Sequence, residues 1–201
     1  MKPIEVHNDY LYVYKPDLPL ADIKQSCDML HDLILQNTNP NHSGGTELGS
    51  ATSKVFDQYN ILLFPFPGMY ELYEAIYNIA VQHIEDWSTN YYLQAWMNYY
   101  WEGENIGWHS HIVSDPPAHH GYFYVDAEES VTSYKFTNGN EVDVPSINGN
   151  LIISRSDGDE HRSWPWPHSD RPRITIAFDI LPAHAMNYGV NHWMPILKKE
   201  N

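Results

Sequence analysis

Three histidines in the second half of the chain are the residues whose type and spacing point most directly to chemistry. His109 and His111 are two positions apart, and His161 follows 50 residues after the second of them. If residues 106–113 form a strand, both members of the pair point to the same face of it. Neutral imidazole is a good ligand for iron, zinc, copper and nickel. The spacing therefore predicts a metal site held by these three side chains.

A strand expected over residues 173–181 supplies a cation for the same site. Apolar and polar positions alternate along it, so Arg173 and Thr175 share the face opposite to the apolar one. A guanidinium beside a hydroxyl offers a carboxylate several donors of fixed geometry. Arg171 competes for this role, but Pro172 separates it from the alternating face. Together with the histidines, the pair predicts a site for a metal and a dianionic ligand.

The composition favours a folded and strongly acidic chain. Its 201 residues fit one domain, residues 1–201, and a hydrophobic share of 42% is typical of a globular core. The formal net charge of −15 repels the phosphates of nucleic acids and anionic lipid surfaces. We therefore expect a small-molecule or peptide substrate as partner, and neither nucleic acid nor a membrane. The pattern indicates no oligomeric state.

Cysteine usage and the N-terminal sequence bear on the compartment. Cys27 is the one cysteine, so no disulfide can form within the chain, and a reducing compartment is favoured. The first residues lack the basic start and apolar stretch of a signal peptide, and no window predicts a membrane span. We expect a cytoplasmic protein.

The expected elements divide the chain into a helical part and a strand-rich part. Residues 1–90 predict a short strand and two amphipathic helices, over about 20–36 and 72–87, with a long polar loop between them. Residues 91–181 predict about seven short strands, and residues 182–201 form a tail. Two helices followed by such strands predict a mainly β fold with flanking helices, of the jelly-roll type. The strands are expected at 10–14, 91–101, 106–113, 121–125, 131–136, 141–144, 150–154 and 173–181.

Five short motifs follow one another in the second half of the chain: Trp108-His109-Ser110-His111, Gly121-Tyr122-Phe123-Tyr124-Val125, Gly149-Asn150-Leu151-Ile152-Ile153, His161 and Arg173-Ile174-Thr175-Ile176-Ala177-Phe178. Taken in this order, they resemble the Fe(II)/2-oxoglutarate-dependent dioxygenase superfamily. The likeness covers about residues 94–181 and extends to a branch of small bacterial and phage oxygenases whose first ligand pair is also His-x-His. It implies a double-stranded β-helix core (jelly roll, cupin-like) that two N-terminal helices buttress. It also implies Fe(II) and 2-oxoglutarate as cofactors of an oxygenase, in particular a hydroxylase.

The resemblance assigns roles to individual residues and exposes one departure. His109 and His161 match the two histidine ligands of the family, and Arg173 matches the residue that pairs with the distal carboxylate of 2-oxoglutarate. Thr175 stands where the family often has Ser. The departure is His111, which stands where most members have Asp or Glu. Asp115 is the alternative third ligand, if the backbone bulges before the prolines that follow it.

Neighbouring residues leave further alternatives open. Asn98 and Tyr124 either contact the co-substrate or pack in the barrel, and Trp164 and Trp166 either border the site or pack a proline-rich turn. Three histidines and a water would also suit zinc as a Lewis acid. The competing functions are therefore a three-histidine, cupin-like metalloenzyme that does not use 2-oxoglutarate and a non-catalytic jelly-roll binding module.

Overall fold

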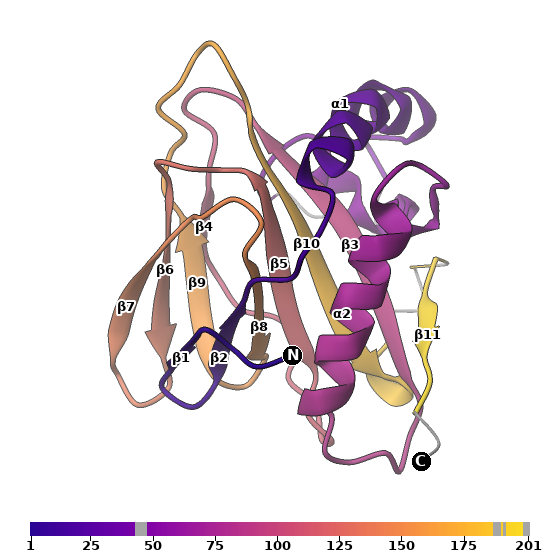
Figure 1. Cartoon of the computed structure of the whole chain (residues 1–201), viewed down its shortest axis with the longest axis vertical. Helices are drawn as coiled ribbons and strands as arrows, with labels where there is room; N and C mark the ends of the chain where they lie inside the picture. Colours follow the sequence, from indigo (N-terminus) through magenta and orange to yellow (C-terminus); the bar gives the residue numbers. More distant parts are fainter. Residues whose placement is uncertain (43–47, 187–189, 191, 199–201) are drawn as a thin grey trace.

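The computed structural model describes residues 1–42, 48–186, 190 and 192–198. Over these residues the chain forms two antiparallel sheets, of seven and four strands, with two long helices beside them (Figure 1). The predicted mainly β fold with flanking helices is confirmed. No helix of the described part has both the length and the apolar character needed to cross a membrane.

The large sheet contains seven strands, and β10 lies between β5 and β3 in it. Its strands, in spatial order, are β1 (Glu5–His7), β2 (Leu11–Tyr14), β8 (Leu151–Arg155), β5 (His119–Asp126), β10 (Arg173–Pro182), β3 (Tyr91–Tyr100) and β11 (Met194–Ile196). The small sheet has the order β4 (Ile106–His109), β9 (Asp159–Ser163), β6 (Val131–Phe136) and β7 (Glu141–Pro145).

From β3 to β10 the chain winds between the two sheets. It places β3, β5, β8 and β10 in the large sheet and β4, β6, β7 and β9 in the small one. The inner faces meet through β5 and β6, where the Tyr122 hydroxyl contacts that of Tyr134 and the Tyr124 hydroxyl lies 3.2 Å from Thr132 Oγ1. This alternation agrees with the winding that a double-stranded β-helix requires.

The two helices cover the other side of the large sheet (Figure 1). In α1 (Leu20–Asn37) the buried positions Ile23, Cys27 and Leu30 recur every three or four residues. In α2 (Met69–His83) the buried positions follow the same helical period. These apolar stripes join one hydrophobic cluster with the strands, as the helical spacing in the sequence predicts. Three short 3-10 turns complete the described elements: Ser53–Gln58, Ile61–Leu63 and Ala183–Ala185.

Strands β1 and β11 were not predicted, and two further strands that differ from the prediction carry the histidines. β4 ends at His109, so His111 lies beyond the strand and not within it. β9 was not expected at all, because its inward-facing residues, Asp159, His161 and Ser163, are all polar. A period-two pattern of polar residues gives no hydrophobic signal. Part of the polar loop at 37–53 lies outside the described residues.

Candidate metal and ligand site

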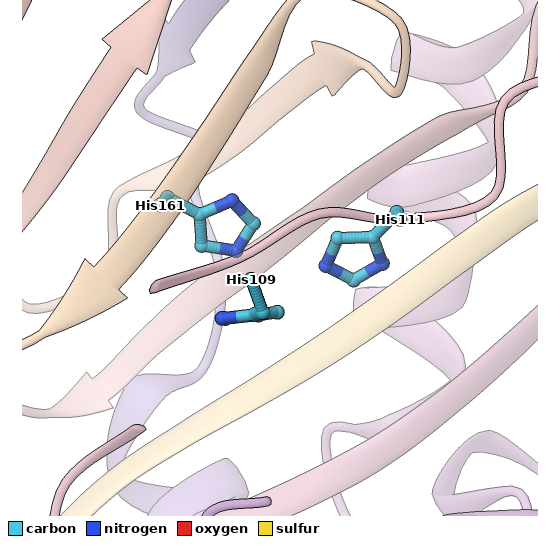
Figure 2. Close-up of side chains that lie close together, drawn as sticks. All are labelled: His109, His111 and His161. Atoms are coloured by element: carbon cyan, nitrogen blue, oxygen red, sulfur yellow. The ribbon is translucent and has the colours of Figure 1, made fainter. Parts of the chain in front are cut away.

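Two strands of the small sheet and the segment after one of them bring the three predicted histidines together. His109 on β4 is the direct cross-strand partner of His161 on β9, with ring centroids 4.3 Å apart. His111, two residues past the end of β4, turns its ring to within 5.2 Å of that of His161. One ring nitrogen of each lies within 4.8 Å of those of the other two. Figure 2 shows the three rings around a common space.

Each of these rings has its Nδ1 engaged by a protein oxygen. Nδ1 of His109 lies 2.9 Å from the Gly107 carbonyl, that of His111 lies 2.6 Å from Asp179 Oδ1, and that of His161 lies 3.0 Å from Asp159 Oδ1. Carbonyl and carboxylate oxygens only accept, so the ring nitrogen must donate its proton in all three bonds. This leaves Nε2 of every ring with a lone pair for a metal, the arrangement that outer partners impose on metal-binding histidines.

Burial keeps two of the three rings neutral near pH 7. It lowers the pKa of His109 to about 4, and the neighbouring His111 adds to the effect. Burial also holds the pKa of His161 well below its ordinary value, although its bond to Asp159 acts the other way. At His111 burial is opposed by the charge and the hydrogen bond of Asp179, which together raise its pKa. Neutral rings bind metals without first losing a proton.

A second group of possible ligands shares His161. His120, Asp159 and His161 offer atoms within 4.8 Å of one another, and all three are buried. Asp159 also accepts a hydrogen bond from the Ser154 hydroxyl, and its pKa lies below the usual range because His120 and His161 outweigh its burial. The ring of His120 stacks on that of His111 at 4.2 Å. His120 and Asp159 therefore lie behind the three-histidine group.

A small cavity of about 60 Å³ opens beside the histidines, and we call it the Arg173 cavity. All three histidines and Arg173 line it, with Asn98 and Thr175. Arg173 is 3% exposed, its Nε donates to Ser130 Oγ at 2.9 Å, and no carboxylate among the described residues pairs with it. A buried guanidinium without a counter-ion is costly, so this cavity is suited to an anion.

A second cavity of about 210 Å³, the Trp193 cavity, adjoins the first. His109 and His111 line both cavities, as do Trp96 and Ile106. The other walls of the Trp193 cavity are mostly apolar and come from far-apart segments, and Asp179 reaches it from β10. The three-histidine group therefore borders two chambers, whereas His120 and Asp159 line neither of them.

The remaining predicted residues divide into those near the cavities and those away from them. Asp115 is exposed and belongs to neither group of possible ligands, so His111 is the third member of the cluster. Tyr124 is buried against Thr132 and does not line the Arg173 cavity, whose wall Tyr122 forms instead. Arg171 pairs with Asp126 at 3.0 Å.

The tryptophans of the proline-rich turn line neither cavity. Trp166 is buried and its indole N–H donates to the Arg171 carbonyl, so its position is explained by packing of the turn. Trp164 is 48% exposed and lies over Arg162.

Asp159 and Asp179 were not predicted as parts of the site, and for His120 the sequence indicated only that one member of the pair His119–His120 could reach it. A signal existed for Asp179, which shares the alternating face of Arg173 and Thr175 on β10. Asp159 stands two residues before His161, and so on the same face of β9, but with that strand unrecognised it looks like part of a solvated turn. His120 belongs to a histidine pair whose inward member cannot be told from spacing alone.

Comparison with known proteins identifies the fold. No protein-family model and no curated protein sequence matches the chain. Among solved structures, a prolyl hydroxylase from Trichoplax adhaerens, in complex with a hypoxia inducible factor peptide, has a TM-score of 0.61 at 9% identity, covering 89% of this chain and 86% of that one. The non-heme alpha ketoglutarate dependent carbocyclase SnoK, from nogalamycin biosynthesis, has a TM-score of 0.56 at 11% identity, covering 85% and 78%.

A third structure, an oxidoreductase of the 2OG-Fe(II) oxygenase family from Burkholderia pseudomallei, has a TM-score of 0.51 at 8% identity, covering 86% of this chain and 84% of that one. At these identities the likeness is one of fold. It confirms, at that level, the resemblance to the superfamily that the sequence motifs carry.

Proposed function

We propose that this chain, which has the fold of the Fe(II)/2-oxoglutarate-dependent dioxygenase superfamily, is a non-haem oxygenase with a double-stranded β-helix core. His109, His111 and His161 would hold Fe(II), and Arg173 would bind the far carboxylate of 2-oxoglutarate. The reaction would convert 2-oxoglutarate and O2 to succinate and CO2, with the second oxygen atom entering a C–H bond of the substrate. One observation carries the proposal: a buried guanidinium that pairs with no carboxylate of the described residues shares a small cavity with three converging imidazoles.

The donor set of this site suits Fe(II) together with a dianion. Three neutral imidazoles leave both charges of the metal uncompensated, one more than in a site with two histidines and a carboxylate. A 2-oxoglutarate dianion would supply two negative charges, while Asp159 and Asp179 add charge from behind the rings. Fe(II), when bound, supplies the redox chemistry that activates O2. The chain supplies orientation, charge and a small cavity.

Arg173 is held in place before any ligand arrives. Ser130 accepts from its Nε and in turn bonds to Ser146 Oγ and the Ala127 carbonyl, each at 2.7 Å. The ring of Tyr100 lies 5.6 Å from the guanidinium carbon. With Nε engaged on one side, the remaining N–H groups form a fork that a carboxylate can accept from. The chain thus orients a dicarboxylate with its other end toward the histidines.

Two polar side chains on the same wall would complete the binding of the co-substrate. The Thr175 hydroxyl and the Asn98 carboxamide lie 3.3 Å apart on paired strands β10 and β3. Asn98 Oδ1 is buried and has no hydrogen-bond partner in the described part of the chain. Thr175 would donate to the carboxylate at Arg173, as the resemblance to the family implies.

The test is an anaerobic titration with Fe(II) and 2-oxoglutarate, followed by visible absorption. The proposal expects the weak band of a 2-oxo acid chelated to iron, and succinate formation when O2 is admitted. Arg173→Ala should abolish the band at the same 2-oxoglutarate concentration. Arg171→Ala is the matched control, because that arginine pairs with Asp126 and lines neither cavity.

Two results would contradict the proposal. Stoichiometric metal binding without the band and without succinate would favour a three-histidine, cupin-like metalloenzyme that uses no 2-oxo acid. Absence of metal binding altogether, with an intact fold, would favour a binding module. The substrate, the position oxidised and the compartment of the protein do not enter this test.

A further inference from the structure

We propose that the Trp193 cavity binds the substrate, and that the substrate is an uncharged, ring-containing small molecule with one hydrogen-bond-accepting oxygen. This inference rests on the proposed function for the direction of the chemistry, because His109 and His111 form the wall through which a bound metal would face the cavity. The cavity itself, its walls and its polar groups are independent of that function.

Aromatic and aliphatic side chains make most of the surface. Phe56, Trp96 and Trp193 provide aromatic walls, and the rings of the first two lie 5.2 Å apart in a tilted arrangement. Ile112 and Leu181 add aliphatic area from the segment after β4 and from β10. Such walls favour a flat apolar ring, which stacks on or against aromatic faces.

The charges around the cavity disfavour an anionic ligand, and its described carboxylate is already engaged. Among the described residues that line it there is no Lys or Arg, so an anionic group would be buried without a partner. The lining carboxylate, Asp179, already accepts a hydrogen bond from His111. The chain as a whole carries a formal charge of −15, which adds to the penalty for an anion.

One polar group of the wall lacks a partner. The indole N–H of Trp193 is buried and has no acceptor in the described part of the chain. A buried donor left unsatisfied destabilises the structure, and an acceptor oxygen on a ligand would satisfy it. A hydroxyl, ether or carbonyl oxygen would do so without adding charge.

The size of the cavity favours a small molecule over a macromolecular substrate. Its volume of about 210 Å³ lies below the range of roughly 300–1,000 Å³ that is usual for drug-sized ligands. A compact ring system fits such a volume.

The experiment measures binding of matched naphthalenes to the full chain by calorimetry, first without metal and then with Mn(II) and 2-oxoglutarate. The probes are 2-naphthol, which is uncharged at neutral pH, the anion 2-naphthoate and the cation 2-naphthylmethylammonium. We expect 2-naphthol to bind at least about tenfold more tightly than either ion, because no described Lys or Arg of the lining would pair with the carboxylate and because Asp179, which could pair with the ammonium, is already hydrogen-bonded to His111. Equal or tighter binding of the anion or the cation would overturn the inference.

Neighbouring exposed residues supply a matched pair of variants. Ile112 is 41% exposed and lines the Trp193 cavity, whereas Val113 is 64% exposed and does not line it. Ile112→Asp should weaken 2-naphthol binding by about tenfold or more, and Val113→Asp should leave it unchanged. Equal effects of the two variants would place the probe elsewhere and overturn the inference.

Trp193→Phe tests the acceptor oxygen. It should weaken 2-naphthol by about threefold to tenfold more than it weakens unsubstituted naphthalene, because both probes lose the same ring contact and only 2-naphthol loses a hydrogen bond. Proton relaxation of 2-naphthol by Mn(II) then reports whether the probe lies beside the histidines, and its absence in a Mn(II)-loaded chain would overturn the inference.

The two proposals fail in different ways. If no 2-oxoglutarate is consumed while 2-naphthol binds in an Ile112-dependent manner, the proposed oxygenase activity fails and the ligand class stands. If succinate forms while none of these probes discriminates by charge, the activity stands and the ligand class fails.

Discussion

The Arg173 cavity and the Trp193 cavity share a wall of Trp96, Ile106, His109 and His111, yet they differ in size and in charge. The first is about 60 Å³ and contains a buried cation, while the second is about 210 Å³ and is mostly apolar. His109 and His111 thus border a cavity suited to an anion on one side. On the other side they border a cavity suited to a neutral molecule. A metal held by these histidines would border both cavities.

The negative charges of the site, like its buried cation, are divided unevenly between the two cavities. Asp179 lines the Trp193 cavity and holds His111, whereas Asp159 is buried behind His161 and lines neither chamber. His111 stands where a carboxylate ligand is usual in the superfamily that the sequence resembles. The third ligand position therefore has no carboxylate of its own. Instead, the Asp179 carboxylate is hydrogen-bonded to Nδ1 of the His111 ring.

The largest effect is expected from His161, which lines only the Arg173 cavity. His161→Ala should lower the affinity for Fe(II) or Co(II) by more than about 100-fold, since losing a ligand costs more than losing an outer partner. Binding of 2-naphthol should stay unchanged, because this ring does not border the Trp193 cavity. Metal titration and calorimetry measure the two effects, and the exposed His184→Ala serves as control.

The His120→Ala variant tests which of the two groups of possible ligands holds the metal. If His120→Ala abolished metal binding as fully as His161→Ala while His109→Ala did not, the metal would be held by His120, Asp159 and His161. The wall that the two cavities share would then hold no metal.

Asp179→Asn should have the next largest effect, a loss of about tenfold to 100-fold in metal affinity. The amide keeps the size of the side chain and an acceptor for His111, so the loss reports the charge. In a His111→Asp background the same substitution should cost less, because the carboxylate is then a ligand itself, and such non-additivity is what a double-mutant cycle measures. Equal costs in both backgrounds would argue against charge compensation by Asp179.

Much of the fold follows from local pattern, and its exceptions lie at the site. Helix α1 and strand β6 are found where apolar spacing predicts them, because their inward faces are hydrophobic. Strand β9 escapes prediction because its inward face serves the site and not the core, with Asp159 and His161 in place of apolar residues. The same polar alternation that hides the strand is what makes it functional.

The sequence predicted four members of the candidate site, His109, His111, His161 and Arg173, but neither Asp159 nor Asp179 nor the shape of the cavities. The spacing of His109, His111 and Arg173 indicates which side chains meet, and the structure brings them to one cavity. The argument that His109 and His111 share a strand was wrong, because β4 ends at His109 and the following segment turns the second ring inward. The bonds to Asp159 and Asp179 depend on strand pairing across the molecule, which a linear pattern does not encode.

A pair of histidines away from both cavities provides a contrast in pH dependence. Burial lowers the pKa of His119 to about 3 and that of His83 to about 4, from an ordinary 6.5. Between pH 6.5 and about 4 the unfolded chain binds protons that the folded chain does not, so the free energy of unfolding falls as pH falls. Each such group contributes up to about 1.4 kcal/mol per pH unit.

Chemical denaturation of the metal-free chain at several pH values measures this decline. His83→Gln keeps a polar partner for the Tyr14 hydroxyl, which lies 2.7 Å from the His83 ring, and should make the decline shallower. An unchanged slope in that variant would show that these rings do not govern acid stability. Metal binding at pH 7 should be the same in the variant, since neither ring lines a cavity beside the metal group.

The smallest effect is expected from the hydroxyl beside Arg173. Thr175→Val preserves the shape of a side chain that is 2% exposed and removes one donor to the carboxylate, so 2-oxoglutarate should bind about threefold to tenfold more weakly. Thr175→Ser keeps the donor and should bind nearly as well as the parent, while 2-naphthol should not distinguish the three proteins. A loss in the Val variant that matched that of Arg173→Ala would mean that the hydroxyl contributes as much as the guanidinium to anion binding in the Arg173 cavity, and the contrast between the two cavities would then rest on hydrogen bonding as much as on charge.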